Sequence, residues 1–261
     1  MGLIKIQLKS ILTFRFITIG MLISILFGIT QAIRLSNELL IKNEKGNISD
    51  FLLFTFGGWQ SPMTLLSITQ WLLLILFVLL ASHWSFLQSK SWMTMVMSRY
   101  TYRFSWWVSN YCAQFFICLI TILLLVIGHI IAGLLFFDMQ LEWSTYTLDQ
   151  YALLSKRSPV QFFQFGFIIL ITGLYFLVFL QMVIQTIFHT KRTSIILFVI
   201  LIMLGFAYIY HQLPRELSPI FYPSTIMAFT NGYTVSILFN IGINILFFIL
   251  SFLFIRIKNI L

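Results

Sequence analysis

The residues best suited to catalysis or metal binding in this sequence are four histidines and two cysteines. Three histidines lie at the ends of apolar runs, where an amphipathic ring is well solvated: His83, His189 and His211. Only His129 falls inside such a run, and we interpret it as hydrogen-bonded to a neighbouring helix rather than as a ligand. Cys112 and Cys118 are six residues apart, do not share a helical face, and are interpreted as small apolar residues.

Motifs that carry nucleotide, metal or nucleophile chemistry are missing. The sequence contains no GxxxxGK[ST] loop, no HExxH or CxxC pair, and no GxSxG turn. We therefore expect that the chain is not an enzyme, that it binds no ATP by itself, and that it has no catalytic, cofactor-binding or metal-binding residues.

The segment 83–110 is rich in aromatic, methionine and basic residues. We expect its middle to form a short helix with an exposed apolar surface, because flexible methionines and a large aromatic make a good docking contact. That surface comprises Trp92, Met93, Met95, Val96 and Met97. Arg99 and Arg103 lie one helical turn apart and suit an acidic partner or lipid phosphates. The alternative is that the surface only lies on the membrane.

The elements that must position these residues are membrane helices. Of 261 residues, 60% are hydrophobic and only 9% are charged, too few charges for the surface of a soluble domain. A membrane-spanning helix needs about 20 apolar residues, and lipid admits helices rather than open strands. The sequence predicts an all-α membrane protein with one transmembrane domain over 1–261. Its six spans lie near 16–33, 64–82, 111–136, 162–188, 195–211 and 235–255.

Two of the charge-free runs, 51–89 and 217–255, are too long for one span. Their first parts, 51–63 and 217–234, contain glycine and proline and are expected to be interfacial or re-entrant pieces on the same side of the membrane. The alternative is an ordinary loop with several aromatic residues. The glycine pairs in two of the spans are expected to permit close helix packing: Gly128 and Gly133, Gly166 and Gly173.

The charges sort by side. One predicted side collects ten basic and no acidic residues, and the other collects six basic residues and all seven acids. Short loops rich in lysine and arginine stay in the cytoplasm, so both termini and the 83–110 loop are expected there, in the cell membrane. Residues 3–14 suit a helix lying in the cytoplasmic interface. The net charge of +9 then requires membrane lipids as partners and no nucleic acid.

No charged residue falls well inside a predicted span. An intramembrane charge is expensive, and proteins that keep one usually use it for proton relay, ion binding or hydrolysis. A proton-coupled transporter or an intramembrane protease is therefore disfavoured.

The Ser98-Arg99 pair, then Arg103, then Trp106-Trp107 leading into the third span resemble the first cytoplasmic loop of ABC-2-type transporter permeases. The layout also agrees over the whole chain. It has an N-terminal interfacial helix, six spans, a proline-containing external stretch before the last span, and a short basic tail.

The resemblance implies a permease subunit that pairs with a second copy or a related permease. A separate cytoplasmic ATPase would bind ATP and Mg²⁺ and drive export of an amphipathic peptide or a lipid-like substrate. The loop would couple to that ATPase through Trp92, Met93, Met95, Ser98, Arg99, Arg103, Trp106 and Trp107. Two alternatives remain open: a membrane scaffold, sensor or immunity protein that transports nothing, and a membrane enzyme or secondary transporter with uncharged polar groups.

Overall fold

The computed structural model describes four long helices and parts of the segments between them. The described residues are 13–58, 70–84, 103–151, 157–188, 195–197, 222–226 and 232–257, with the single residues 9, 154, 199, 200, 202, 203 and 228. The helices are α2 (Phe14–Lys42), α3 (Ile48–Phe56), α5 (Arg103–Gly133), α6 (Thr145–Gln150), α7 (Pro159–Phe188) and α10 (Tyr233–Ile257). A further apolar helix covers Gln70–Trp84. This part of the chain contains no β-strand.

Four helices, α2, α5, α7 and α10, are long and apolar enough to cross a membrane. They make the chain an all-helical, multi-pass membrane protein, as the composition predicted. The predicted span at 64–82 is described from Gln70 onward as a shorter helix. The predicted span at 195–211 falls largely outside the described residues, and so does the predicted interfacial helix at 3–14.

Two helices extend beyond the predicted limits. α2 continues nine residues past 33, and an i, i+4 ion pair of 3.2 Å between Arg34 and Glu38 lies on this extension. It ends where Asn43 adopts a left-handed conformation with φ of 55°. α5 begins at Arg103 rather than near 111, so the predicted 83–110 loop is shorter than expected. Charges and aromatic residues limit an apolar run without ending a helix.

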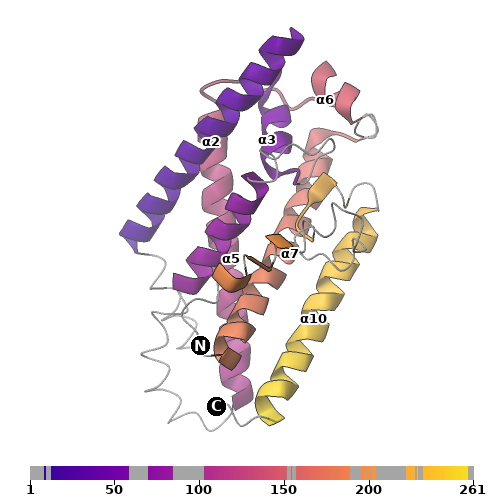
Figure 1. Ribbon diagram of the computed structural model, residues 1–261. Helices are drawn as coiled ribbons and strands as arrows, with labels where there is room; N and C mark the ends of the chain where they lie inside the picture. Colours follow the sequence, from indigo (N-terminus) through magenta and orange to yellow (C-terminus); the bar gives the residue numbers. More distant parts are fainter. Residues whose placement is uncertain are drawn as a thin grey trace.

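α2 and α5 lie side by side and pack against each other along their length (Figure 1). Their contact is lined by small residues. A Cβ on Gly28 would lie 2.7 Å from the Ala132 Cβ, and one on Gly128 would lie 2.3 Å from the Ser24 Oγ. The backbones therefore approach as closely as glycine allows, and the packing role predicted for Gly128 is confirmed.

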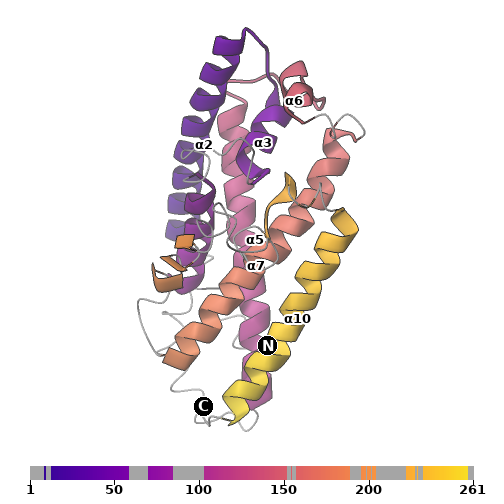
Figure 2. The same cartoon turned by 45° about the vertical axis from the view of Figure 1, so that its right-hand side comes forward.

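α7 crosses between α5 and α10 (Figure 2). Its contacts are largely aromatic: the Phe179 ring lies 4.7 Å from Tyr111 and 5.5 Å from Phe247. Tyr175 donates a hydrogen bond of 2.8 Å to the Tyr111 carbonyl. A Cβ on Gly173 would lie 2.4 Å from the backbone nitrogen of Pro223, so this glycine admits the 222–226 segment against α7.

The first of the two segments expected to be re-entrant is described over 51–58, and most of that part belongs to a buried helix. α3 turns back between the long helices (Figure 1), and seven of its nine residues are buried. The second segment contacts the C-terminal end of α3. The Ile226 N–H donates to the Gly57 carbonyl at 2.9 Å, and the Thr225 hydroxyl donates to the same carbonyl at 3.1 Å. The alternative of an ordinary loop is wrong for 51–56, which are helical, and 59–63 lie outside the described residues. That both segments are interfacial or re-entrant on one side of the membrane stays a prediction.

Candidate functional site

The end of the bundle where α2 stops is held by a buried carboxylate. Asn47 and Asp50 form a capping box at the start of α3, with the Asn47 N–H donating to Asp50 Oδ2 at 2.9 Å. Asp50 Oδ1 accepts from the Thr147 hydroxyl at 2.6 Å and from the Ser144 N–H at 3.2 Å. Asp50 is 2% exposed. One carboxylate therefore joins α3 to the segment that carries α6.

A second polar layer lies beside this cap. The Arg34 Nε donates to Glu38 Oε1 at 3.2 Å, an Nη1 of Arg34 donates to Gln70 Oε1, and the guanidinium lies 4.9 Å from the Phe54 ring centre. Tyr146 donates its hydroxyl hydrogen to Glu38 Oε2 at 3.1 Å. Burial and the negative charge of Glu38 raise the pKa of Tyr146 to about 12, so the phenol stays protonated and a donor.

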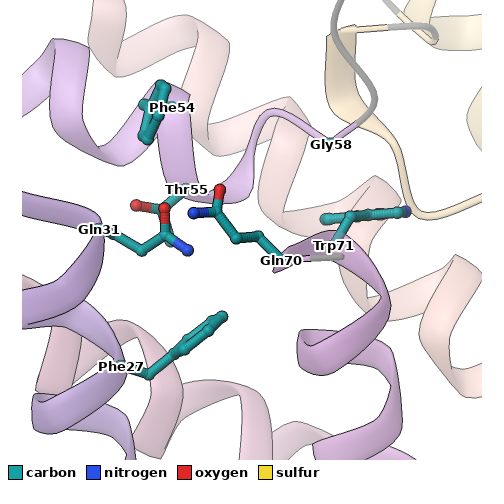
Figure 3. Close-up of a pocket in the computed structure, with 7 residues that line it drawn as sticks. All are labelled: Phe27, Gln31, Phe54, Thr55, Gly58, Gln70 and Trp71. Carbon is teal, nitrogen blue, oxygen red and sulfur yellow. The ribbon is translucent and has the colours of Figure 1, made fainter. Parts of the chain in front are cut away.

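Next to Arg34 is a small polar cavity of about 10 Å³, enough for one water-sized group. Figure 3 shows Gln31, Thr55 and Gln70 pointing toward one another from α2, α3 and the Gln70–Trp84 helix. The Gln31 Oε1 is buried and has no hydrogen-bond partner in the described part of the chain. An unpaired buried acceptor is costly, so a hydrogen-bond donor placed at this atom would stabilise the site.

A larger apolar groove adjoins this cavity. Its volume is about 220 Å³. It lies between α2 and the Gln70–Trp84 helix, with Leu125 of α5 contributing to its lining. Phe27 lines both the groove and the polar cavity. The other residues that line the groove are Ile23, Leu73, Leu74, Leu76, Phe77 and Leu80.

His129 lies deep in the bundle at the α2–α5 contact. Its Nδ1 is 2.7 Å from the Leu125 carbonyl and 3.3 Å from the Ser24 Oγ, so it contacts the neighbouring helix as predicted. Its ring packs among three phenylalanines at centroid distances of 5.6, 6.4 and 5.0 Å: Phe27, Phe51 and Phe56. The described residues contain no cluster of metal-binding side chains, so His129 has no second ligand there.

The predicted coupling residues fall in two places. Five of them lie outside the described residues: Trp92, Met93, Met95, Ser98 and Arg99. Arg103 and Trp106 belong to the first turns of α5. Trp107 is fully buried, with its ring 5.6 Å from that of Phe179 on α7. This side chain belongs to the core, and it fixes the end of the predicted loop to the bundle.

The polar cavity and the cap were not predicted from the sequence. Gln31 and Gln70 are uncharged polar residues at or near the predicted spans, and such residues usually face a protein interior. The spacing of Asn47 and Asp50 is that of a capping box, so it is a readable signal for the start of α3. The two cysteines are free thiols, as expected, and Cys118 is buried.

No family model matches the sequence, and no curated protein or solved structure matches the chain. The function is therefore inferred from the residues and the geometry alone.

Proposed function

We propose that this chain is the permease subunit of an ATP-driven ABC transporter, and that it exports an amphipathic peptide or a lipid-like substrate. In this proposal it has six spans, with both termini in the cytoplasm. Two copies, or this chain and a related permease, enclose the pathway, and a separate ATPase binds ATP and Mg²⁺.

The observation that carries the proposal is the position of Trp107. It follows the Ser98-Arg99 and Arg103 pattern and is buried against Phe179 at the start of a 31-residue helix. A force applied to the loop before Arg103 would enter α5 and, through the Gly28 and Gly128 contacts, α2. That connection is what a transporter needs to convert a motion of the ATPase into a motion of the bundle.

The charge distribution supports an external energy source. In the described parts of α2, α5, α7 and α10, charged residues lie toward the helix ends: Arg15, Arg34, Glu38, Lys42, Arg103 and Arg256. The buried polar groups in the middle are neutral, among them Gln114, Gln181 and Asn244. They hold helices together, as when Ser82 donates to Gln114 Oε1 at 2.7 Å. Such a bundle suits a transporter whose energy comes from a separate ATPase.

The test is affinity purification of the tagged chain from its own host in a gentle detergent, with mass spectrometry and an ATPase assay. We expect a stoichiometric ATPase that dissociates, or loses stimulation, when Trp92→Glu and Met95→Glu are combined. The matched control is Met139→Glu, because Met139 is 74% exposed on the predicted outer side. A chain that purifies alone and stimulates no ATPase contradicts the proposal and favours the scaffold or immunity protein.

The proposed topology has its own test in intact cells. A cysteine at Lys45, in a background with Cys112→Ser and Cys118→Ala, should react with a membrane-impermeant maleimide. A cysteine at Arg99 should react only after the cells are opened. The reverse pattern would overturn the orientation while leaving the helical structure intact.

A further inference from the structure

We propose that the groove between α2 and the Gln70–Trp84 helix binds one uncharged single-chain amphiphile. The hydrocarbon chain lies in the groove, and a terminal hydroxyl enters the polar cavity and donates to the Gln31 Oε1. This inference does not depend on the permease proposal, because it concerns binding to the chain itself.

The shape of the groove fits one chain. α2 and the Gln70–Trp84 helix run in opposite directions along it, since Gln31 and Gln70 line the same cavity, while a Cβ on Gly20 would lie 3.9 Å from Phe77. From Leu73 to Leu80 the groove follows seven residues of helix, a length of about 10 Å. Its lining is almost wholly apolar, so it receives hydrocarbon.

The chemistry of the cavity selects the head group. The Gln31 Oε1 only accepts hydrogen bonds, and in the described structure nothing donates to it. The space of about 10 Å³ holds a hydroxyl and excludes a phosphate. Arg34 is already bound to Glu38 and Gln70, so the nearby positive charge is compensated. A neutral donor is therefore favoured over an anionic head group.

The direction of the site matches the orientation of a membrane lipid. Gln31 lies one turn from Arg34 and two turns from Glu38, at the charged end of the apolar run 16–33, and Ile23 lies near the middle of that run. An amphiphile bound with its hydroxyl at Gln31 thus has its polar end near the charged end of the helix and its chain directed toward the apolar part. No reorientation is needed for it to enter from the membrane.

The experiment is native mass spectrometry of the purified full chain in detergent, titrated with oleyl alcohol or with its methyl ether. The two probes share one chain, but only the alcohol donates a hydrogen bond. We expect one alcohol per chain, bound about tenfold more tightly than the ether. Gln31→Leu should abolish this preference while leaving chain binding, and Leu73→Trp should fill the groove and remove the binding of both probes.

Leu238→Trp, on the exposed face of α10, is the matched control and should bind both probes as the unchanged chain does. Equal retention of alcohol and ether by the unchanged chain would overturn the proposal, because the groove would then hold ordinary lipid chains. A preference that survives Gln31→Leu would also overturn it. Neither result depends on whether an ATPase copurifies, so this outcome is separable from that of the permease test.

Discussion

Two halves of the bundle are built in different ways. In the first half, α2 and α5 meet through small residues, and the buried Asp50 closes the end. In the second half, α7 and α10 meet through aromatic rings, with Phe247 5.5 Å from Phe179 and 5.6 Å from Phe176. Asparagine side chains of α10 add hydrogen bonds, as where Asn240 donates to the Tyr222 carbonyl at 3.0 Å.

This difference indicates which helices resist moving relative to each other. A contact made by glycine, alanine and serine has no large side chain that can rotate to relieve strain, so we infer that α2 and α5 resist being moved apart. Aromatic rings and asparagine side chains can repack, and the apolar part of α10 is more exposed than that of α2 or α5. We infer that α10 can shift against α7 at lower cost than α2 can shift against α5.

The largest effect is expected from Gly128→Val. Its Cβ would lie 2.3 Å from the Ser24 Oγ and 3.2 Å from the Ile25 backbone nitrogen, so α2 and α5 must separate. We expect a loss of about 3 kcal/mol or more, seen as a lower melting temperature in detergent or as aggregated protein. Gly242→Val is the matched control, because nothing lies within 4 Å of its Cβ position. Equal melting temperatures of the two variants would contradict the rigid contact.

Asp50→Ala should have the next largest effect, because it leaves the buried donors of Asn47 and Thr147 and the half-buried N–H of Ser144 without their shared acceptor. We expect a loss of about 2 kcal/mol and faster proteolysis of the segment between α5 and α7. Thermal unfolding and limited proteolysis measure the two effects. Asp149→Ala changes an exposed carboxylate of α6 and should leave both unchanged; if it matches Asp50→Ala, the cap is not what stabilises this end.

In the second half, Asn240→Leu should lower the free energy of unfolding by less than the two preceding substitutions. It removes hydrogen bonds to Thr172 at 3.2 Å and to Tyr222 at 3.0 Å, and membrane hydrogen bonds of this kind contribute about 1 kcal/mol. A small fall in melting temperature, smaller than that of Gly128→Val, is the expected result. Thr234→Leu, at an exposed position of the same helix, serves as the control. A fall as large as that of Gly128→Val would show that the two halves are equally rigid.

The sequence predicts the long helices because a helix that crosses lipid needs a long run of apolar residues. The cores of α7 and α10 agree with the predicted spans at 162–188 and 235–255 within a few residues. The predicted spans do not give the helix ends, since Arg34 and Trp107 are helical although they lie outside those spans. Helix ends depend on caps and on tertiary contacts, which composition does not record.

The polar cavity is less predictable than the spans. Gln31, Thr55 and Gln70 come from three segments, and only the fold brings them together. Sequence identifies each glutamine as unusual for lipid, but it does not say which of them meet. The coupling residues show the opposite case, since the Ser98-Arg99 pattern is visible in the sequence and that pair lies outside the described residues. Their role stays a prediction.

The smallest effect at neutral pH is expected from Tyr146→Phe. It removes one hydrogen bond to Glu38, but the Glu38 side chain is 36% exposed and keeps Arg34, so water replaces the phenol at low cost. The stability of the variant should differ from that of the unchanged chain at alkaline pH.

Burial and Glu38 raise the pKa of Tyr146 from 10 to about 12. The protonated phenol therefore stabilises the fold fully below pH 10, and this contribution is lost as pH rises toward 12. Thermal unfolding from pH 8 to 11.5 should therefore show a shallower decline for Tyr146→Phe than for the unchanged chain. Parallel curves would mean that Tyr146 is not held by the first half of the bundle. Tyr151→Phe provides the comparison, since burial also raises the pKa of Tyr151.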